Sequence, residues 1–135
     1  MAVFADTSAL YAVLDADDAN HGKAAAEWRR LLEAGEPLVT TNYVLVETAA
    51  LVQHRLGMEA LRVLQQDAAP VIGVKWIDER AHEAGVAAVL AAGRRGLSLV
   101  DCASFGAMRH LGIREVFAFD PDFAEQGFSC LPAPE

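Results

Sequence analysis

The chain has 135 residues, and its nineteen Asp and Glu against eleven Lys and Arg give a formal net charge of −8 at pH 7. Hydrophobic residues make up 53% of the sequence, so one domain can bury a core without disulfides or a structural metal. This composition excludes intrinsic disorder and the disulfide-stapled miniproteins. A pI of about 4.9 also disfavours a protein that coats nucleic acid through a basic surface.

Cysteine usage and hydropathy indicate a single cytoplasmic domain. Cys102 and Cys130 lie in apolar stretches and form no C-x-x-C pair, which is typical of buried thiols in a reducing compartment. No apolar run reaches the roughly 18 residues of a membrane span. We find no repeat or linker, so we expect one domain over residues 1–135, with 132–135 as a short tail.

Strands and helices alternate along the chain. Apolar runs predict strands over residues 2–5, 37–40, 70–74, 115–119 and 128–131. Periodic apolar residues and cap signals predict a helix that begins near Thr7 and further helices over 19–34, 41–56, 58–67, 77–92 and 98–112. This alternation predicts an α/β sandwich around a mainly parallel sheet, with the functional site outside the carboxyl ends of the strands.

Three segments each contain a single charged residue, and in each case it is an acid. Segments 1–14, 37–53 and 97–108 contain, respectively, Asp6, Glu47 and Asp101. An isolated buried carboxylate must be protonated, paired with a cation or bound to a metal, because an uncompensated buried charge is too costly. Glu47 is the clearest case, since its helical neighbours three and four residues away are mostly apolar.

Helix capping is an alternative explanation for three acids. Asp6 could cap the first helix, Ser98 and Asp101 fit a capping box, and Asp120 before a proline could cap a short turn. Glu47 has no comparable local explanation. Acids gathered at one end of a sheet repel one another, and the usual relief is a hard divalent cation with oxygen ligands. The pattern therefore predicts a Mg²⁺ or Mn²⁺ site.

Sites made of carboxylates and divalent ions mostly support phosphoryl and phosphodiester chemistry. Such chemistry needs no Ser, Cys or His nucleophile. The four histidines form no i, i+4 metal pair, and none is next to a lone acid, so we interpret them as surface or core residues. The predicted reaction is metal-assisted cleavage of a phosphodiester.

The ordered set of motifs resembles PIN domains, and more narrowly the VapC-type toxin ribonucleases of bacterial toxin-antitoxin pairs. The matching segments run through nearly the whole chain and include Asp6-Thr7-Ser8 and Asp120-Pro121-Asp122; they cover residues 3–10, 40–47, 97–105, 117–123 and 127–128. The resemblance implies a single PIN-like (Rossmann-like) α/β/α sandwich with a mainly parallel central sheet. It also implies a metal-dependent endoribonuclease that hydrolyses RNA phosphodiester bonds at an acidic Mg²⁺ or Mn²⁺ site.

The same resemblance assigns roles to residues of this chain. The catalytic acids it implies are Asp6, Glu47, Asp101 and Asp120. Asp6, Asp101 and Asp120 would hold the metal, while Glu47 would position or deprotonate a water. Thr7, Ser8 and Ser98 would support the site. Asp122 would belong to the turn or lie outside the metal's ligands.

The resemblance also implies partners: an RNA substrate such as tRNA or rRNA, a cognate VapB-type antitoxin and a second copy in a homodimer. The arginines that could bind RNA are scattered, and each is better explained as a solvated surface residue: Arg29, Arg30, Arg94, Arg95, Arg109 and Arg114.

Two alternatives belong to other functional classes. A receiver-type signalling domain is also a small acidic α/β protein that uses Mg²⁺, but it expects a lysine after the last main strand, where this chain has Asp120. The second alternative is a catalytically silent PIN-fold module that binds a protein partner, which the four acids disfavour.

Overall fold

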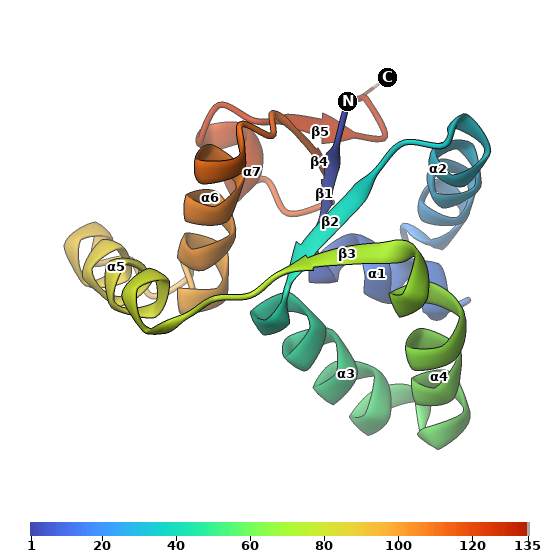
Figure 1. Ribbon diagram of the computed structural model, residues 1–135. Coiled ribbons are helices and arrows are strands. Elements are labelled where there is room, and N and C mark those ends of the chain that lie inside the picture. Colours follow the sequence, from blue (N-terminus) through green and yellow to red (C-terminus); the bar gives the residue numbers. More distant parts are fainter. Residues whose placement is uncertain (135) are drawn as a thin grey trace.

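The computed structural model describes residues 1–134, so Glu135, the end of the expected tail, lies outside the described residues. Five strands form one sheet in the order β3-β2-β1-β4-β5, and every neighbouring pair is parallel (Figure 1). The strands are β1 (Val3–Ala5), β2 (Leu38–Thr41), β3 (Ile72–Lys75), β4 (Glu115–Phe117) and β5 (Ser129–Leu131). The predicted α/β sandwich around a parallel sheet is confirmed.

Helices lie on both sides of the sheet (Figure 1). On one side α6 (Leu99–Leu111) lies between α5 (Glu79–Ala92) and the sheet. The other helices are α1 (Thr7–Leu14), α2 (His21–Ala34), α3 (Asn42–Leu56), α4 (Met58–Val63) and the short α7 (Asp122–Glu125). A π-helical turn (Leu64–Ala68) and a 3₁₀ turn (Ala69–Val71) lead from α4 into β3. None of the helices in residues 1–134 is long and apolar enough to cross a membrane.

Side-chain caps and glycines define most helix ends close to the predicted positions. Thr41 accepts a hydrogen bond from the Val44 N–H at the start of α3, and Ser98 does the same for Asp101 in α6. Gly35 ends α2 with a φ of 68°, a left-handed conformation that favours glycine. The sequence therefore specifies these boundaries locally.

Several predicted element ends differ from the structure by two residues. The strand expected from residue 70 begins at Ile72, because Ala69–Val71 form a 3₁₀ turn. At two other ends a long-range hydrogen bond engages a backbone N–H. The helix expected from residue 77 begins after Asp78, since the Ile77 N–H donates to Asn42 Oδ1 at 2.6 Å. The strand expected to reach residue 119 ends at Phe117, since the Phe119 N–H donates to Ser8 Oγ at 2.9 Å.

The core is built around the two central strands. Every residue of β1 is buried, and the largest fully buried side chains include Phe4, Phe117 and Phe123. Cys102 is buried and Cys130 is half-buried, so the expectation of two buried thiols holds for the first alone. Burial raises the pKa of both thiols, which keeps them protonated and unreactive near neutral pH.

The strand order reverses between β1 and β4. From β1 the chain moves outward to β2 and β3, then returns to place β4 on the other side of β1. Ala5 pairs with Phe117, and the Asp6 N–H donates to the Phe117 carbonyl at 3.0 Å. Segments that follow these two strands therefore emerge side by side, at the switch point where α/β folds bind their ligands.

Helix α5 contacts α6 at a glycine, which gives a test of this packing. A Cβ at Gly85 would lie 3.1 Å from Leu99 Cδ1, whereas a Cβ at Gly106 in α6 would have no neighbour within 4 Å. We expect Gly85→Val to lower the free energy of unfolding by about 1–3 kcal/mol through overpacking. Gly106→Val should change it by less than about 0.5 kcal/mol. Urea denaturation measures both, and equal effects would contradict the packing.

Candidate metal centre

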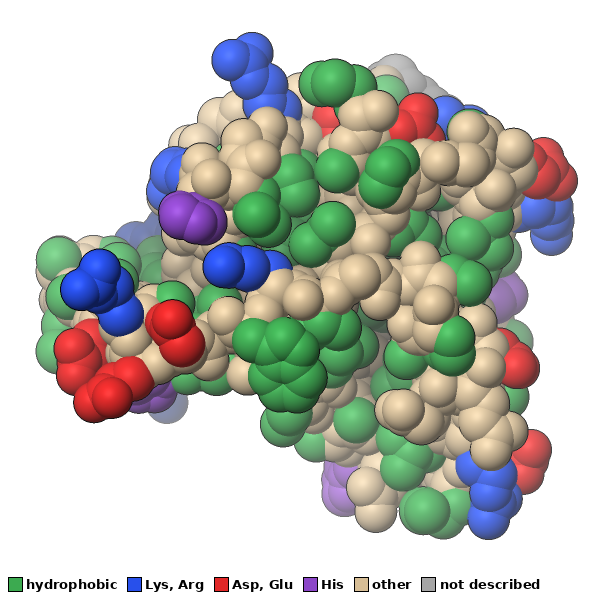
Figure 2. All heavy atoms as spheres, in the orientation of Figure 1, with side chains coloured by type: hydrophobic (Ala, Val, Ile, Leu, Met, Phe, Trp, Pro, Cys, Tyr) green, Lys and Arg blue, Asp and Glu red, His purple; other side chains and the backbone are tan. Residues whose placement is uncertain are grey.

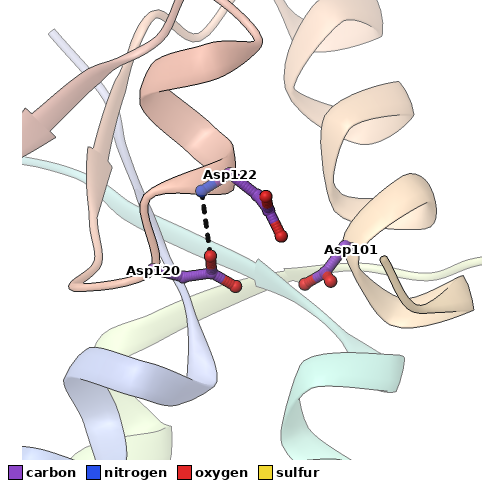
Figure 3. A group of neighbouring side chains, drawn as sticks. All are labelled: Asp101, Asp120 and Asp122. Atoms are coloured by element: carbon purple, nitrogen blue, oxygen red, sulfur yellow. Dashed lines mark hydrogen bonds between the residues drawn. The ribbon is translucent and has the colours of Figure 1, made fainter. Parts of the chain in front are cut away.

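Three aspartates meet at the carboxyl end of the sheet, beyond the switch point. Asp101 lies in the first turn of α6, Asp120 follows β4, and Asp122 is the first residue of α7. Each offers a carboxylate oxygen, and these oxygens all lie within 4.8 Å of one another (Figure 3). We call these three residues the aspartate cluster. All three are half-buried.

Asp6 lies beside the cluster and is tied to it through Ser8. Its side chain is 4% exposed, and Oδ2 accepts from the Ser8 N–H at 3.1 Å and from the Ser8 hydroxyl at 2.7 Å. The same hydroxyl accepts from the Phe119 N–H at 2.9 Å, next to Asp120. Ser8 thus connects Asp6 to the end of β4, and its supporting role at the site stays a prediction.

Asp6, Asp101 and Asp120 each use one carboxylate oxygen in a local hydrogen bond and leave the other open. Asp101 Oδ2 accepts from the Ser98 N–H at 3.0 Å, which completes a capping box, and Asp120 Oδ1 accepts from the Asp122 N–H at 2.9 Å. The second oxygens of Asp6, Asp101 and Asp120 accept no hydrogen bond from residues 1–134. Capping and metal binding are therefore compatible, because the cap fixes one oxygen and directs the other.

Burial and mutual repulsion shape the ionisation of these acids. The pKa of Asp6 is raised to about 6. Burial is the largest cause of the rise, the Ser8 hydrogen bonds oppose it, and the negative charges of Asp101 and Asp120 add to it. Burial also raises the pKa of Asp120, an effect that the Asp122 N–H opposes and the neighbouring carboxylates reinforce. A bound cation would reverse both shifts, since it favours the ionised carboxylate.

Glu47 stands apart from the cluster. It is half-buried in the second turn of α3, and within residues 1–134 its carboxylate has no hydrogen-bond or ion-pair partner. The buried setting expected for it is wrong, because the core face of α3 is formed by Val44, Thr48 and Val52. Its side chain is consequently free to contact solvent or a substrate.

The hydroxyl of Thr7 contacts α3. Thr7 Oγ1 donates to the Val44 carbonyl at 3.4 Å and accepts from Thr48 Oγ1 at 3.0 Å. This pair fixes the start of α3, and with it Glu47, against the helix that follows Asp6. Thr7 therefore acts on the arrangement of the helices and makes no hydrogen bond to the acids.

Two features of the site go beyond the sequence prediction. Asp122 is expected in the turn or as a supporting group outside the metal's ligands, but its carboxylate lies within the cluster; the Asp-Pro-Asp spacing, which folds the second acid back on the first, is the sequence signal for this position. Arg94 contacts Asp122 Oδ1 at 3.3 Å and Glu125 Oε2 at 3.6 Å. No sequence signal distinguishes Arg94 from the other arginines.

Comparison with known proteins decides the family. The model of the PIN domain family matches residues 3–129. The chain belongs to the PIN domain family. It is 35% identical over 128 residues to the 23S rRNA-specific endonuclease VapC20 of Mycobacterium tuberculosis, covering 93% of this chain and 95% of that protein. The resemblance to PIN domains of the VapC type is confirmed.

Solved structures agree with this assignment. The crystal structure of Mycobacterium tuberculosis VapC20, described as a sarcin-ricin loop cleaving toxin, superimposes with a TM-score of 0.81 at 34% identity, over 93% of this chain and 95% of that one. FitAcB from Neisseria gonorrhoeae gives a TM-score of 0.68 at 15% identity, over 96% of both chains, and this likeness concerns the fold alone.

The cluster fits a hard divalent cation. Its donors are all carboxylate oxygens, the ligand type that suits Mg²⁺ and Mn²⁺, and no Cys or His belongs to the group. The residues that would hold the ion are the aspartate cluster together with Asp6.

The raised pKa of Asp6 predicts a pH-dependent cost in stability. Because the pKa rises from 3.8 to about 6 on folding, the stability that neutral Asp6 contributes is complete below pH 4 and is lost as the pH rises through 6. In EDTA at pH 7.5, Asp6→Asn should stabilise the protein by up to about 3 kcal/mol, and near pH 3.5 the difference should vanish.

Urea titrations of both proteins at several pH values measure this dependence. Asp67→Asn, at an exposed position, serves as the matched control and should show no such trend. A stability difference between Asp6→Asn and wild type that is the same at both pH values would contradict the burial argument.

Proposed function

We propose that the protein is a metal-dependent endoribonuclease that acts as the toxin of a toxin-antitoxin pair. The observation that carries the proposal is the aspartate cluster, with its open oxygens, at the switch point of a PIN-domain sheet. The 35% identity to a 23S rRNA-specific endonuclease over 93% of the chain supports the same activity.

In this proposal Asp101, Asp120 and Asp122 hold the cation, with Asp6 as a further ligand or water-mediated contact. A Mg²⁺ or Mn²⁺ ion, when bound, would polarise the scissile phosphate and lower the pKa of a coordinated water. Glu47 would orient the attacking water or accept its proton, since its carboxylate has no competing partner within residues 1–134.

We further propose ribosomal RNA as the substrate class. The related VapC20 is named for 23S rRNA, and its crystal structure is described as that of a sarcin-ricin loop cleaving toxin. The net charge of −8 favours a selective, metal-bridged contact with one RNA structure over general adhesion to RNA.

Partners expected for such a toxin are a VapB-type antitoxin and a second copy of the chain, and the proposed location is the cytoplasm. Hydrophobic side chains occupy the middle of the face shown in Figure 2, while charged side chains lie mostly at its periphery. Several large apolar residues are exposed, among them Val46, Trp76 and Leu90. These residues are candidates for the antitoxin or dimer surface.

The two alternatives predict different behaviour. A receiver domain would accept a phosphoryl group, but Asp120 stands where its lysine is expected and the family match is to PIN domains. A silent module would bind a partner without cleaving RNA, so a cleavage assay separates it from the proposed enzyme.

The decisive assay incubates the protein with a synthetic sarcin-ricin loop RNA and, in parallel, with total RNA, in Mn²⁺ or in EDTA, and maps the cut sites. We expect site-specific cleavage in Mn²⁺ alone. Asp101→Asn should reduce the rate at least about 100-fold because it removes a metal ligand whose effect is worth several kcal/mol.

Asp67→Asn is the control and should cleave like the wild type. An unchanged thermal transition of Asp101→Asn would show that the fold is preserved, since the amide oxygen of the substituted side chain can still cap α6. Full activity of Asp101→Asn, or equal cleavage in EDTA, would refute the proposed site.

Glu47→Gln tests a role separate from metal binding. We expect kcat to fall by about 10²–10⁴, the range for loss of a general base, with Mn²⁺ affinity unchanged because Glu47 lies outside the cluster. Single-turnover cleavage and calorimetric Mn²⁺ titration measure the two quantities. A variant with normal kcat would remove Glu47 from the mechanism.

A further inference from the structure

Arg94 is the basic residue that forms an ion pair with the aspartate cluster in residues 1–134. Its guanidinium spans two acids of α7, with Nη2 at 3.3 Å from Asp122 Oδ1 and Nη1 at 3.6 Å from Glu125 Oε2. Each acid therefore receives one contact, and neither has the bidentate pairing that makes arginine–carboxylate pairs strong. The Arg94 side chain is 52% exposed, so the ion pair is also weakened by solvent.

The backbone that carries Arg94 is fixed, whereas its side chain can move. Gly93 turns the chain with a φ of 61°, the Leu97 N–H donates to the Arg94 carbonyl at 3.2 Å, and the Leu97 side chain is 5% exposed. Ser98 and the cluster residue Asp101 follow directly. The guanidinium is consequently held at the edge of the cluster on an anchored loop.

A cation at the cluster changes the balance of charge around Arg94. Without it, Arg94 partly compensates the repulsion among the acids. With it, the positive ion shares Asp122, and the electrostatic attraction between Arg94 and Asp122 decreases. A phosphate presents several anionic oxygens to the guanidinium fork, which makes it a better partner than two single carboxylate contacts.

We propose that Arg94 is a substrate-binding residue that leaves Asp122 when the metal site fills and then binds an RNA phosphate next to the scissile one. The proposal rests on the proposed function and assigns the same site a phosphate contact. In the free protein Arg94 neutralises part of the negative charge of the aspartate cluster. It therefore competes with the cation for Asp122, and this competition ends when both the metal and the RNA are bound.

The test compares Arg94→Ala with Arg95→Ala, the neighbouring exposed arginine with no ion pair in residues 1–134. In calorimetric titration with Mn²⁺ alone, Arg94→Ala should bind about two- to fivefold more tightly than wild type, as expected when a half-exposed ion pair at a ligand is lost. Arg95→Ala should change this affinity less. Mn²⁺ binding by Arg94→Ala that is no tighter than that of Arg95→Ala would overturn the competition.

Binding of the sarcin-ricin loop RNA is measured by fluorescence anisotropy in Mn²⁺, with Glu47→Gln as the background that slows cleavage. Arg94→Ala should weaken binding about tenfold and reduce the slope of log affinity against log salt by about 0.7, the value for one phosphate contact. Glu125→Gln, which removes a competing acid outside the cluster, should tighten binding. If Arg94→Ala leaves the slope of log affinity against log salt unchanged, the phosphate contact is overturned, and the role of Arg94 is limited to its surface ion pairs with Asp122 and Glu125.

Failure of the proposed function has a different signature. A wild-type protein that binds this RNA through Arg94 but never cleaves it would contradict the endonuclease while supporting the phosphate contact. Cleavage with an unchanged KM and salt dependence in Arg94→Ala would support the enzyme and refute the role of Arg94.

Discussion

The pairing of β1 with β4 is the constraint on which the site depends. These strands are separated by more than a hundred residues of chain, yet Ala5 pairs with Phe117 and the Asp6 N–H closes the ladder on the Phe117 carbonyl. Their carboxyl ends therefore open at the same point, where the strand order reverses. Asp6 follows β1 and Asp120 follows β4 at this point. The Ser8 hydroxyl links the two segments, because it donates to Asp6 Oδ2 and accepts from the Phe119 N–H. Without this pairing the acids would be isolated caps on separate helices.

Local capping and the proposed metal site use the same carboxylates. A helix N-terminus supplies unpaired N–H groups that hold an acid in a fixed orientation and favour its charge. Asp6 and Asp101 each give one oxygen to such groups and keep the other free. This arrangement reduces the entropy lost when a cation binds, since the ligands are already ordered. It also explains why residues with capping signals in the sequence are the same acids that are proposed to bind the metal.

The acidity of the chain is partly a property of this site. Two divalent ions would reduce the formal net charge from −8 to −4, and one would reduce it to −6. Negative charge is thus concentrated where a cation could neutralise it, and in the proposed function an RNA phosphate would approach a metal-compensated surface. Arg94 neutralises further negative charge at the edge of the aspartate cluster, because its guanidinium contacts Asp122 inside the cluster and Glu125 outside it.

The sequence by itself determined the alternation of strands and helices, most helix ends and the acids Asp6, Asp101 and Asp120, because these depend on local signals: periodicity, caps and charge isolated among apolar residues. Only the tertiary structure decided three points. The approach of α6 to the segment after β4 placed Asp101 against Asp120 and Asp122, the packing of α3 left Glu47 half-buried, and the folding of the 93–98 loop onto α7 selected Arg94 among the arginines. Each of these depends on contacts between elements that the sequence does not place relative to one another.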